Sequence, residues 1–168
     1  QGVNRLTSCD EINIMNRRGL IIIFLFMLAL ACAAFLLILF APRTASQTKT
    51  ITLGGQSLEV ELALTLEAQA LGLGGRDRLE ENRGMLFIFP EAAVRHFWMK
   101  GMRFPIDIIW LRDNKIIGIL ENVTPIDGTA GAPLSLYASP APADKVLEIN
   151  ADLVKKWGIE TGDIVTLR

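Results

Sequence analysis

An uncharged apolar segment near the N-terminus limits what this chain can fold into more than any other feature of its sequence. Residues 19–40 contain no charged side chain. As an α-helix this segment would be about 33 Å long, which matches the hydrocarbon core of a bilayer. The sequence therefore predicts a single transmembrane helix at residues 19–40, with the membrane as a partner of the chain.

The charges on either side of this segment predict its orientation. Arg17 and Arg18 stand directly before it, whereas the basic residues that follow, Arg43 and Lys49, are more dispersed. Basic residues beside a membrane helix favour the cytoplasmic side. We therefore expect residues 1–18 to form a cytoplasmic tail. The chain after the helix is expected on the outer side of the cytoplasmic membrane, in the periplasm or outside the cell.

Two other interpretations of the segment stay open. A cleaved signal peptide has a shorter apolar core, and the candidate cleavage site here has Arg43 where a small residue is usual. Lipidation at Cys32 would leave apolar residues at the start of the mature protein, where polar ones are usual. An uncleaved anchor is the favoured interpretation. Because Met15 directly precedes the basic flank, we expect residues 1–14 to be a non-native upstream extension or part of a longer tail.

The composition of the chain argues against several classes of function. Charged residues make up 21% of the chain and the net charge is −1, so no bulk positive charge favours nucleic-acid binding. Two cysteines and one histidine are too few for a zinc site of these ligands. The glycines at residues 72–75 lack the lysine and serine or threonine of a phosphate-binding loop. We therefore expect no nucleic acid, no metal and no organic cofactor.

The rest of the chain is predicted to be a tether at residues 41–50 and an exported β domain at residues 51–168. Its clearest pattern is the alternation of apolar and polar side chains over residues 57–66, which is typical of a half-buried strand. Gly54 and Gly55 directly before it predict a two-residue hairpin turn. The sequence therefore places a β-hairpin at the start of the domain.

A continuous apolar run at residues 84–89, stopped by Pro90, predicts a strand that is buried on both faces. Asp113 and Asn114 predict a tight turn between two further strands. The full set of expected strands is 48–53, 57–66, 84–89, 97–100, 106–111, 115–123, 145–149 and 163–167.

Two short helices are expected, at residues 67–71 and 151–157. Asn150 is the predicted N-cap of the second helix, and Gly158 is its predicted C-terminal stop. Residues 124–143, rich in proline and glycine, predict a long loop of the kind that is often functional. These patterns together predict a mainly β fold: a compact β-sandwich or barrel-like domain with one or two short helices, preceded by one transmembrane helix.

Several motifs of the β domain resemble one known family. They are GMLFIF at 84–89, FWMK at 97–100, PIDIIW at 105–110, VLEIN at 146–150 and GIETGD at 158–163. In this order they resemble the domain of unknown function 192, an uncharacterised conserved prokaryotic family, from near Thr50 to Leu167. The resemblance implies a compact β-sandwich-like fold, commonly exported behind a signal or anchor, and no established activity. Gly101 and Met102 stand where the family often has asparagine and threonine.

Trp98, Lys100 and Asp107 form the strongest candidate site. On a strand, Trp98 and Lys100 share a face. Asp107 lies inside an apolar strand, so its carboxylate requires a cation or several backbone donors. We expect Lys100 or Arg103 as the cation, with Arg76 in reserve. The cluster is interpreted as a partly buried ion pair beside a packed tryptophan, as a ligand site with an aromatic platform, or as the site of a catalytic lysine.

Arg76, which follows the glycine-rich turn, is either a solvated loop charge or a clamp for an anion in the same cleft. The single histidine, His96, is expected at the surface. Two functions stay open. One is a ligand-binding or envelope-assembly module, with an envelope glycan or protein as ligand and with Arg76, Trp98, Lys100 and Asp107 at its site. The other is a glycan-modifying envelope enzyme that uses Lys100 and Asp107 to handle protons. The binding module is favoured, because no catalytic constellation is evident.

Overall fold

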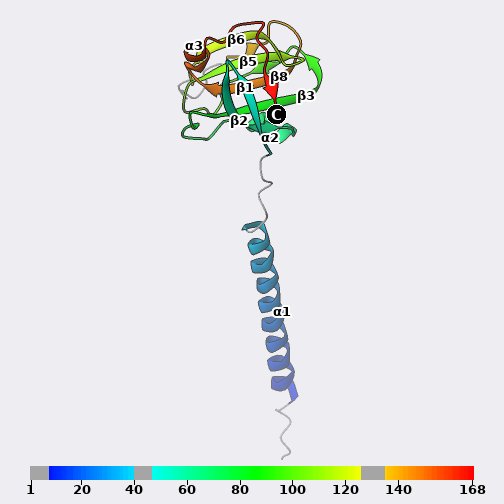
Figure 1. Cartoon of the computed structure of the whole chain (residues 1–168). Helices are drawn as coiled ribbons and strands as arrows, with labels where there is room; N and C mark the ends of the chain where they lie inside the picture. The colour runs from blue at the N-terminus through cyan, green and yellow to red at the C-terminus, as the bar shows by residue number, and fades with distance from the viewer. Residues whose placement is uncertain (1–7, 40–46, 126–134) are drawn as a thin grey trace, which may run out of the picture. The chain divides into compact units, whose positions relative to one another are not determined.

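The computed structural model describes residues 8–39, 47–125 and 135–168 of the chain (Figure 1). The chain divides between residues 45 and 46 into two compact units. The first contains a single long helix. The second is mainly β, as the sequence predicts, and carries the candidate site.

The helix of the first unit is α1 (Ser8–Leu39). Within it, Gly19–Leu36 has a mean hydropathy of 2.9, and none of these residues is buried. A helix of this length and composition near an N-terminus fits either a membrane anchor or a signal sequence. α1 begins well before the predicted apolar segment, whose last residue, Phe40, lies outside the described residues.

The β domain is built on a seven-stranded sheet with the strand order β6-β5-β8-β3-β2-β1-β9. All neighbouring strands are antiparallel except β2 and β3, which run parallel. Two further strands, β4 and β7, pair with each other, and two short helices, α2 and α3, complete the domain. The bounds are β1 (Thr48–Leu53), β2 (Gln56–Ala63), α2 (Leu66–Leu71), β3 (Arg83–Ala93), β4 (His96–Phe97), β5 (Ile106–Arg112), β6 (Lys115–Val123), β7 (Tyr137–Ala138), β8 (Ala143–Asn150), α3 (Leu153–Trp157) and β9 (Thr166–Leu167).

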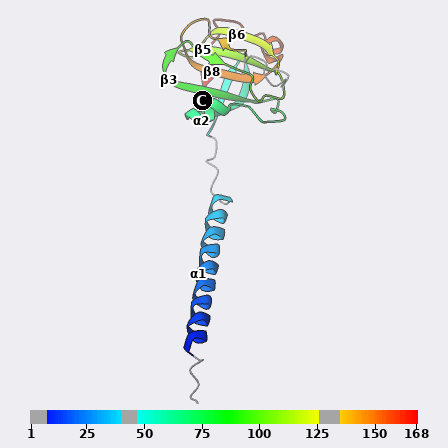
Figure 2. The same ribbon diagram turned by 180° about the vertical axis from the view of Figure 1, so that it is seen from behind.

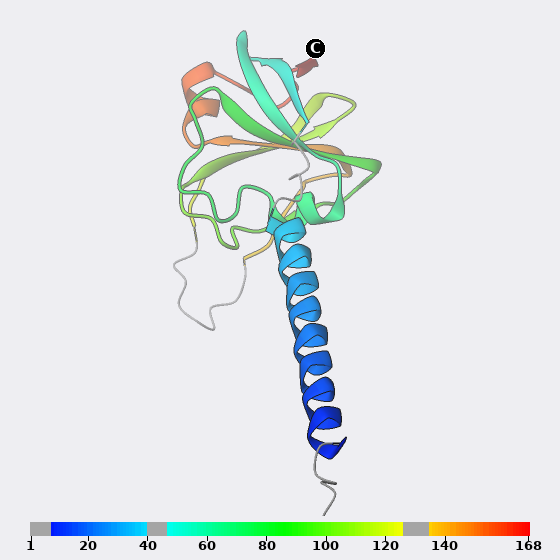
Figure 3. The ribbon, with the colours of Figure 1, turned by 90° about the horizontal axis from the view of Figure 1, so that it is seen from below.

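The two ends of this sheet approach each other, which curls it into a half-barrel. Lys115, at the start of edge strand β6, forms a β-bridge with Ile164, just before the opposite edge strand β9. The N–H of Ile116 donates to the carbonyl of Asp163 at 2.9 Å. Figures 1 and 2 show the curled sheet from two sides, and in Figure 3 the hairpin of β1 and β2 crosses the central strands steeply. The barrel-like fold predicted from the sequence is confirmed.

The central strands β3, β5 and β8 are buried on both faces of the sheet. On β3, Leu86 packs into an apolar cluster with residues of β1, β2 and α3, whereas Met85 and Phe87 pack into a second cluster. Because successive side chains of a strand point to opposite faces, the two clusters lie on the two sides of the sheet. Two-sided burial is confirmed for residues 84–87, and Ile88 and Phe89 are half-buried.

Both predicted hairpin turns are present. Gly54 and Gly55 have φ angles of 55° and 73°, and Asp113 and Asn114 have φ angles of 51° and 67°. The residues on either side of each turn are paired across the hairpin. Two consecutive positive φ angles give a turn whose twist matches that of the strands, and glycine, asparagine and aspartate adopt it most readily.

The structure shortens the predicted strand at residues 57–66. β2 ends at Ala63, and Leu64 and Leu66 are 47% and 82% exposed, although the alternation places them on the buried face. The reason is local. Thr65 is the N-cap of α2, and its hydroxyl accepts a hydrogen bond from the N–H of Ala68 at 3.2 Å, so the chain leaves the sheet there.

The largest other differences in strand bounds concern three segments, whereas the strands predicted at 106–111 and 145–149 are each longer by one to three residues. β3 continues through Pro90 to Ala93, because its pairing with β8 is broken between Ile88 and Ala93 and no N–H is required at the proline. The segment at 97–100 is extended only at Phe97, and the strand at 163–167 is reduced to β9. Of the predicted loop, residues 126–134 lie outside the described residues, while β7 and the first residue of β8 lie within it.

The prediction that Asn150 caps the last helix is wrong. The N-cap of α3 is Asp152, which has a φ of 67° and makes no side-chain cap. The Asn150 amide instead donates to the carbonyls of Leu79 and Glu80, at 3.1 and 3.0 Å. The predicted stop at Gly158 is confirmed, with a φ of 62°. The Asn150 side chain therefore forms a tertiary contact instead of the helix cap that a local rule predicts.

Candidate functional site

A pocket of about 310 Å³ lies beside α2 on the second apolar face of the sheet. Its wall combines the end of α2, the strands β3 and β8 and the segment around β4. Most lining side chains are apolar or aromatic, and a few are polar, as is typical of small-molecule sites. The lining residues are Gln69, Ala70, Leu71, Gly72, Leu73, Phe87, Phe89, Val94, Arg95, His96, Phe97, Trp98, Lys100, Met102 and Glu148.

Glu148 is the unusual residue of this wall. It lies on β8, opposite Met85 of β3 on one side and Ile108 of β5 on the other, and both of these neighbours are buried. Gly72, at the C-terminus of α2, lies over it with a φ of 53°. A Cβ at that position would stand 3.4 Å from the Phe87 ring and 3.8 Å from Glu148 Oε2. These are ordinary contact distances, so the positive φ at the end of the helix, and not a lack of space, favours glycine at this position.

The Glu148 carboxyl is only partly compensated for its burial. The residue is 5% exposed, and its buried Oε2 has no hydrogen-bond partner in the part of the chain that the structure describes. Loss of hydration raises the pKa of Glu148 to about 8, and the charge of Arg76 lowers that pKa only in part. The carboxyl is therefore mainly protonated at neutral pH and can act as a hydrogen-bond donor as well as an acceptor.

Arg76 is engaged elsewhere. Its Nη1 and Nη2 donate to the two carboxylate oxygens of Glu61, at 2.5 and 2.8 Å. This pairing raises the pKa of Arg76 further, so its charge is permanent. Because the guanidinium makes a two-pronged contact with Glu61, it acts on Glu148 through its charge rather than through a hydrogen bond.

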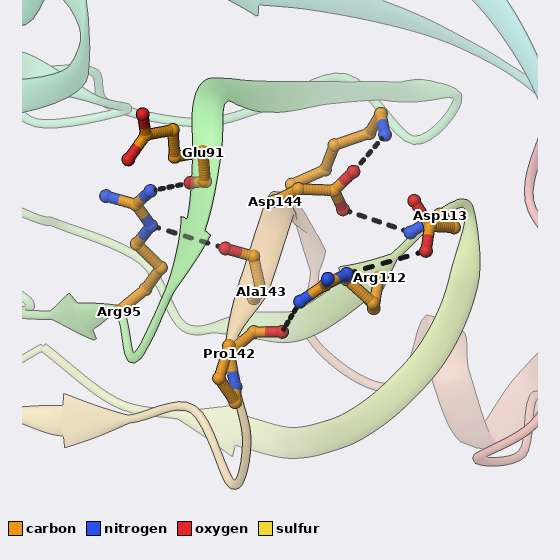
Figure 4. A network of polar contacts seen from close by, with 8 residues as sticks. Glu91, Arg95, Arg112, Asp113, Pro142, Ala143 and Asp144 are labelled. Carbon is orange, nitrogen blue, oxygen red and sulfur yellow. Dashed lines mark hydrogen bonds and ion pairs between the residues drawn. The ribbon is translucent and has the colours of Figure 1, made fainter.

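Two further cations stand at the pocket. The Arg95 guanidinium lies 3.8 Å above the centre of the Phe89 ring, and its Nε donates to the carbonyl of Ala143 at 3.3 Å. Its Nη2 donates to the carbonyl of Glu91, and Figure 4 shows both contacts. Lys100 is exposed. Within residues 47–125 and 135–168, neither cation forms an ion pair with a carboxylate.

Two of the four predicted site residues are thus brought together. Trp98 and Lys100 both line the pocket, and Trp98 is 44% exposed at its edge. Met99, between them, is 2% exposed and packs into the core, so the two side chains share a face although the strand has ended at Phe97. His96, predicted at the surface, is exposed and lines the same pocket.

Asp107 lies elsewhere. Its partner on β8 is Ile149, whereas Glu148 faces the neighbouring Ile108, so the two acidic side chains lie on opposite faces of the sheet. Asp107 is fully buried. Its Oδ1 accepts from the N–H of Asn122 at 2.8 Å, and its Oδ2 accepts from the N–H of Val154 at 2.9 Å.

The prediction of a cation beside Asp107 is therefore wrong, and backbone donors take its place. No lysine or arginine in the described part of the domain forms an ion pair with this carboxylate. Arg103 pairs with Asp77 instead, and Arg76 pairs with Glu61. The two hydrogen bonds tie β5 to β6 and to the first turn of α3, so the role that the structure gives Asp107 is architectural.

Sequence reasoning missed Glu148 as a site residue. The signal was available, because Glu148 interrupts an apolar strand in the same way as Asp107 does. Nothing in the sequence says which of the two carboxyl groups meets backbone donors and which meets a pocket, since that depends on the faces of paired strands far apart in the chain.

The comparisons with known proteins agree on a family. The family model of DUF192, described as an uncharacterized ACR, matches residues 49–167. A crystal structure of a candidate transcription regulator from Sinorhizobium meliloti is 30% identical with a TM-score of 0.66, over 74% of this chain and 97% of that chain.

The crystal structure of a protein of unknown function from Novosphingobium aromaticivorans resembles this chain to a comparable extent. It is 32% identical with a TM-score of 0.63, over 74% of this chain and 88% of that chain. No curated protein matches the sequence. The motifs, the fold and the family model agree, and the chain belongs to the DUF192 family of uncharacterised proteins.

Proposed function

We propose that this protein is a membrane-anchored binding module that takes a small ligand, or the end of a longer one, into the Glu148 pocket. The observation that carries the proposal is Glu148, which lines an open and largely apolar pocket and whose buried Oε2 has no hydrogen-bond partner among the described residues. A buried polar group without a partner costs about 1–3 kcal/mol. A ligand that hydrogen-bonds the carboxyl would recover much of that cost.

The rim of the pocket supports the same proposal. Trp98 leaves 44% of its surface exposed beside the opening, together with the exposed Leu71 of α2 and Val94. Exposed aromatic and apolar side chains around a concave surface are typical of binding sites. The envelope ligands considered from the sequence, a glycan or a peptide segment, could enter such a pocket through a terminal unit.

The proposed place of the domain is the outer face of the cytoplasmic membrane. In this arrangement α1 crosses the membrane once, with Arg17 and Arg18 inside and the domain outside. A reporter that is active only outside the cytoplasm, fused after Arg168, should be active. Changing both arginines to glutamate should reduce the activity, and a reporter signal confined to the cytoplasm in the natural sequence would contradict this topology.

The alternative, a glycan-modifying enzyme with Lys100 and Asp107 as its proton-handling pair, has less support. Lys100 lines the pocket, but Asp107 is not among its lining residues. Both Asp107 oxygens accept backbone hydrogen bonds. A carboxylate held in this way is poorly placed to exchange protons with a substrate in the pocket.

A fragment screen tests the binding function. The full-length protein in lipid nanodiscs would be heated with each of a set of small organic compounds, and unfolding followed by tryptophan fluorescence. Some compounds should raise the melting temperature of the natural protein but not of Trp98→Ala. Leu66→Ala is the matched control, because Leu66 is 82% exposed and does not line the pocket. Equal protection of Trp98→Ala, or protection by no compound, would contradict the proposal.

A further inference from the structure

We propose that the ligand of the Glu148 pocket is a small organic anion, with a negatively charged group on a compact apolar ring. This inference rests on the proposed function, because it names the ligand class of the same pocket. Three features of the wall lead to it: the cations at the rim, the neutral polar group in the wall and the apolar surface between them.

The rim carries positive charge that the described wall does not cancel. Of the lining side chains, Arg95 and Lys100 are cations and Glu148 is the only carboxyl group. Arg95 is held by two backbone carbonyls and by the Phe89 ring, contacts that orient the guanidinium without neutralising it. Both charges attract an anion to the pocket and repel a cation.

The carboxyl in the wall does not reverse this preference. Burial keeps Glu148 mainly protonated at neutral pH, so its O–H and its carbonyl oxygen offer neutral hydrogen bonds. A cationic ligand would gain an ion pair only if Glu148 ionised, and burial opposes that ionisation more than the charge of Arg76 favours it. The ligand therefore places its charge at the rim and an uncharged part against Glu148.

The remaining wall favours an apolar body. Leu73, Phe87, Phe97 and Met102 offer no strong hydrogen-bonding groups. The amide nitrogen of Gln69 is already occupied, since it donates to the carbonyls of Ala63 and Ile88 at 3.1 and 2.9 Å. A ring that stacks against aromatic side chains matches this surface better than a polyhydroxylated ring, whose hydroxyl groups would need many partners.

Three probes with the same ring separate the charge states: benzoate, benzamide and benzylamine. Each would be titrated by calorimetry into the full-length protein in nanodiscs at about pH 7 and low salt, with glucuronate as an anion on a polar ring. Benzoate should bind about tenfold more tightly than the other three, the ratio expected for one charge-assisted hydrogen bond. Lys100→Gln should remove most of that preference and Lys100→Arg should keep it.

Lys49→Gln is the matched control, because Lys49 is an exposed lysine of β1 outside the pocket wall. It should leave all affinities unchanged. Benzamide or benzylamine binding as tightly as benzoate would overturn the anionic class while the binding function stands. A benzoate preference that survives Lys100→Gln would overturn the placement of the anion beside Lys100. Tighter binding of glucuronate than of benzoate would overturn the inference that the body of the ligand is apolar. Binding of none of the four probes would overturn the anionic class, and the fragment screen then decides the binding function separately.

Discussion

Replacing Glu148 by glutamine should destabilise the β domain at low pH and stabilise it at high pH. The carboxyl has a pKa of about 8 in the folded protein and an ordinary value of 4.5. Between these values the unfolded chain has lost the proton that the folded chain still holds. The folded state then binds more protons than the unfolded state, so the free energy of unfolding falls as the pH rises through this window. Above about 8 both states are ionised and the decline ends.

The magnitude follows from the width of the window. Each pH unit between 4.5 and 8 lowers the free energy of unfolding by about 1.4 kcal/mol. The natural protein therefore loses about 5 kcal/mol of stability over the whole window and about 3 kcal/mol up to pH 7. A turn of Arg76 from Glu61 toward an ionised Glu148 would reduce both figures. The stability of Glu148→Gln does not fall with pH in this way. Its buried amide lacks partners, however, which lowers the free energy of unfolding by about 1–3 kcal/mol at every pH. The two stability curves should therefore cross between pH 4.5 and 8.

Urea unfolding followed by tryptophan fluorescence measures this crossing. All three tryptophans, Trp98, Trp110 and Trp157, lie in the β domain, so the signal reports on this unit and not on α1. The difference in unfolding free energy between the two proteins would be taken at several pH values from about 5 to 8. The other titrating groups are common to both chains and largely cancel in the difference.

Glu81→Gln is the control. Glu81 is exposed and its hydrogen bond with Lys156 lowers its pKa, so it is ionised throughout this range and its difference curve should be flat. A flat curve for Glu148→Gln would refute the reasoning. It would mean that the folded carboxyl is already ionised at low pH, either hydrated through the pocket or neutralised by a cation.

Three further substitutions should have separate effects. Asp107→Asn should lower the unfolding free energy by about 1–3 kcal/mol in the same urea assay, because one of two backbone N–H groups loses its acceptor; unchanged stability would contradict the architectural role. Gly72→Ala should lower the unfolding free energy in that assay by about 1–3 kcal/mol, because the φ of 53° at this position is unfavourable for alanine. Unchanged stability would show that α2 can end with a different backbone conformation. Arg76→Gln should raise the pKa of Glu148, measured by carbon NMR of its carboxyl, and a lowered pKa would contradict the field assigned to Arg76.

Local patterns in the sequence predicted those features that depend on a few neighbouring residues. The turn at Gly54 and Gly55 and the turn at Asp113 and Asn114 were correct, because positive φ angles favour these residue types wherever they occur. The buried strand at 84–89 was identified because a strand covered on both faces needs apolar residues at every position. Neither inference required knowledge of the partner strands.

Features that depend on distant pairing were not predictable in this way. β8 lies between β5 and β3 in the sheet although it follows both in the chain, and no local pattern encodes that insertion. Asn150 was assigned to a helix cap by its position, and the fold uses it to hold the carbonyls of Leu79 and Glu80. A sequence also does not show which backbone N–H groups will meet a buried carboxylate, because almost every residue has such a donor.

The two carboxyl groups of the central strands have different surroundings. Both interrupt apolar strands, and both are almost fully removed from water. Asp107 receives two backbone hydrogen bonds, so replacing it should weaken the fold. Glu148 lines a pocket and has a buried oxygen without a partner among the described residues, so we expect the domain to be less stable with an ionised group there than with a neutral one.

The proposed binding function gives such a group a role, because a contact that forms only on ligand binding would compensate a cost in the free domain. The effects of Asp107→Asn and Glu148→Gln at about pH 8 should therefore have opposite signs. Ligand binding should respond in the reverse way, with affinity retained in the folded fraction of Asp107→Asn and reduced in Glu148→Gln. If both variants lost stability equally and neither lost affinity, Glu148 would be a second structural residue and the pocket would have no special group.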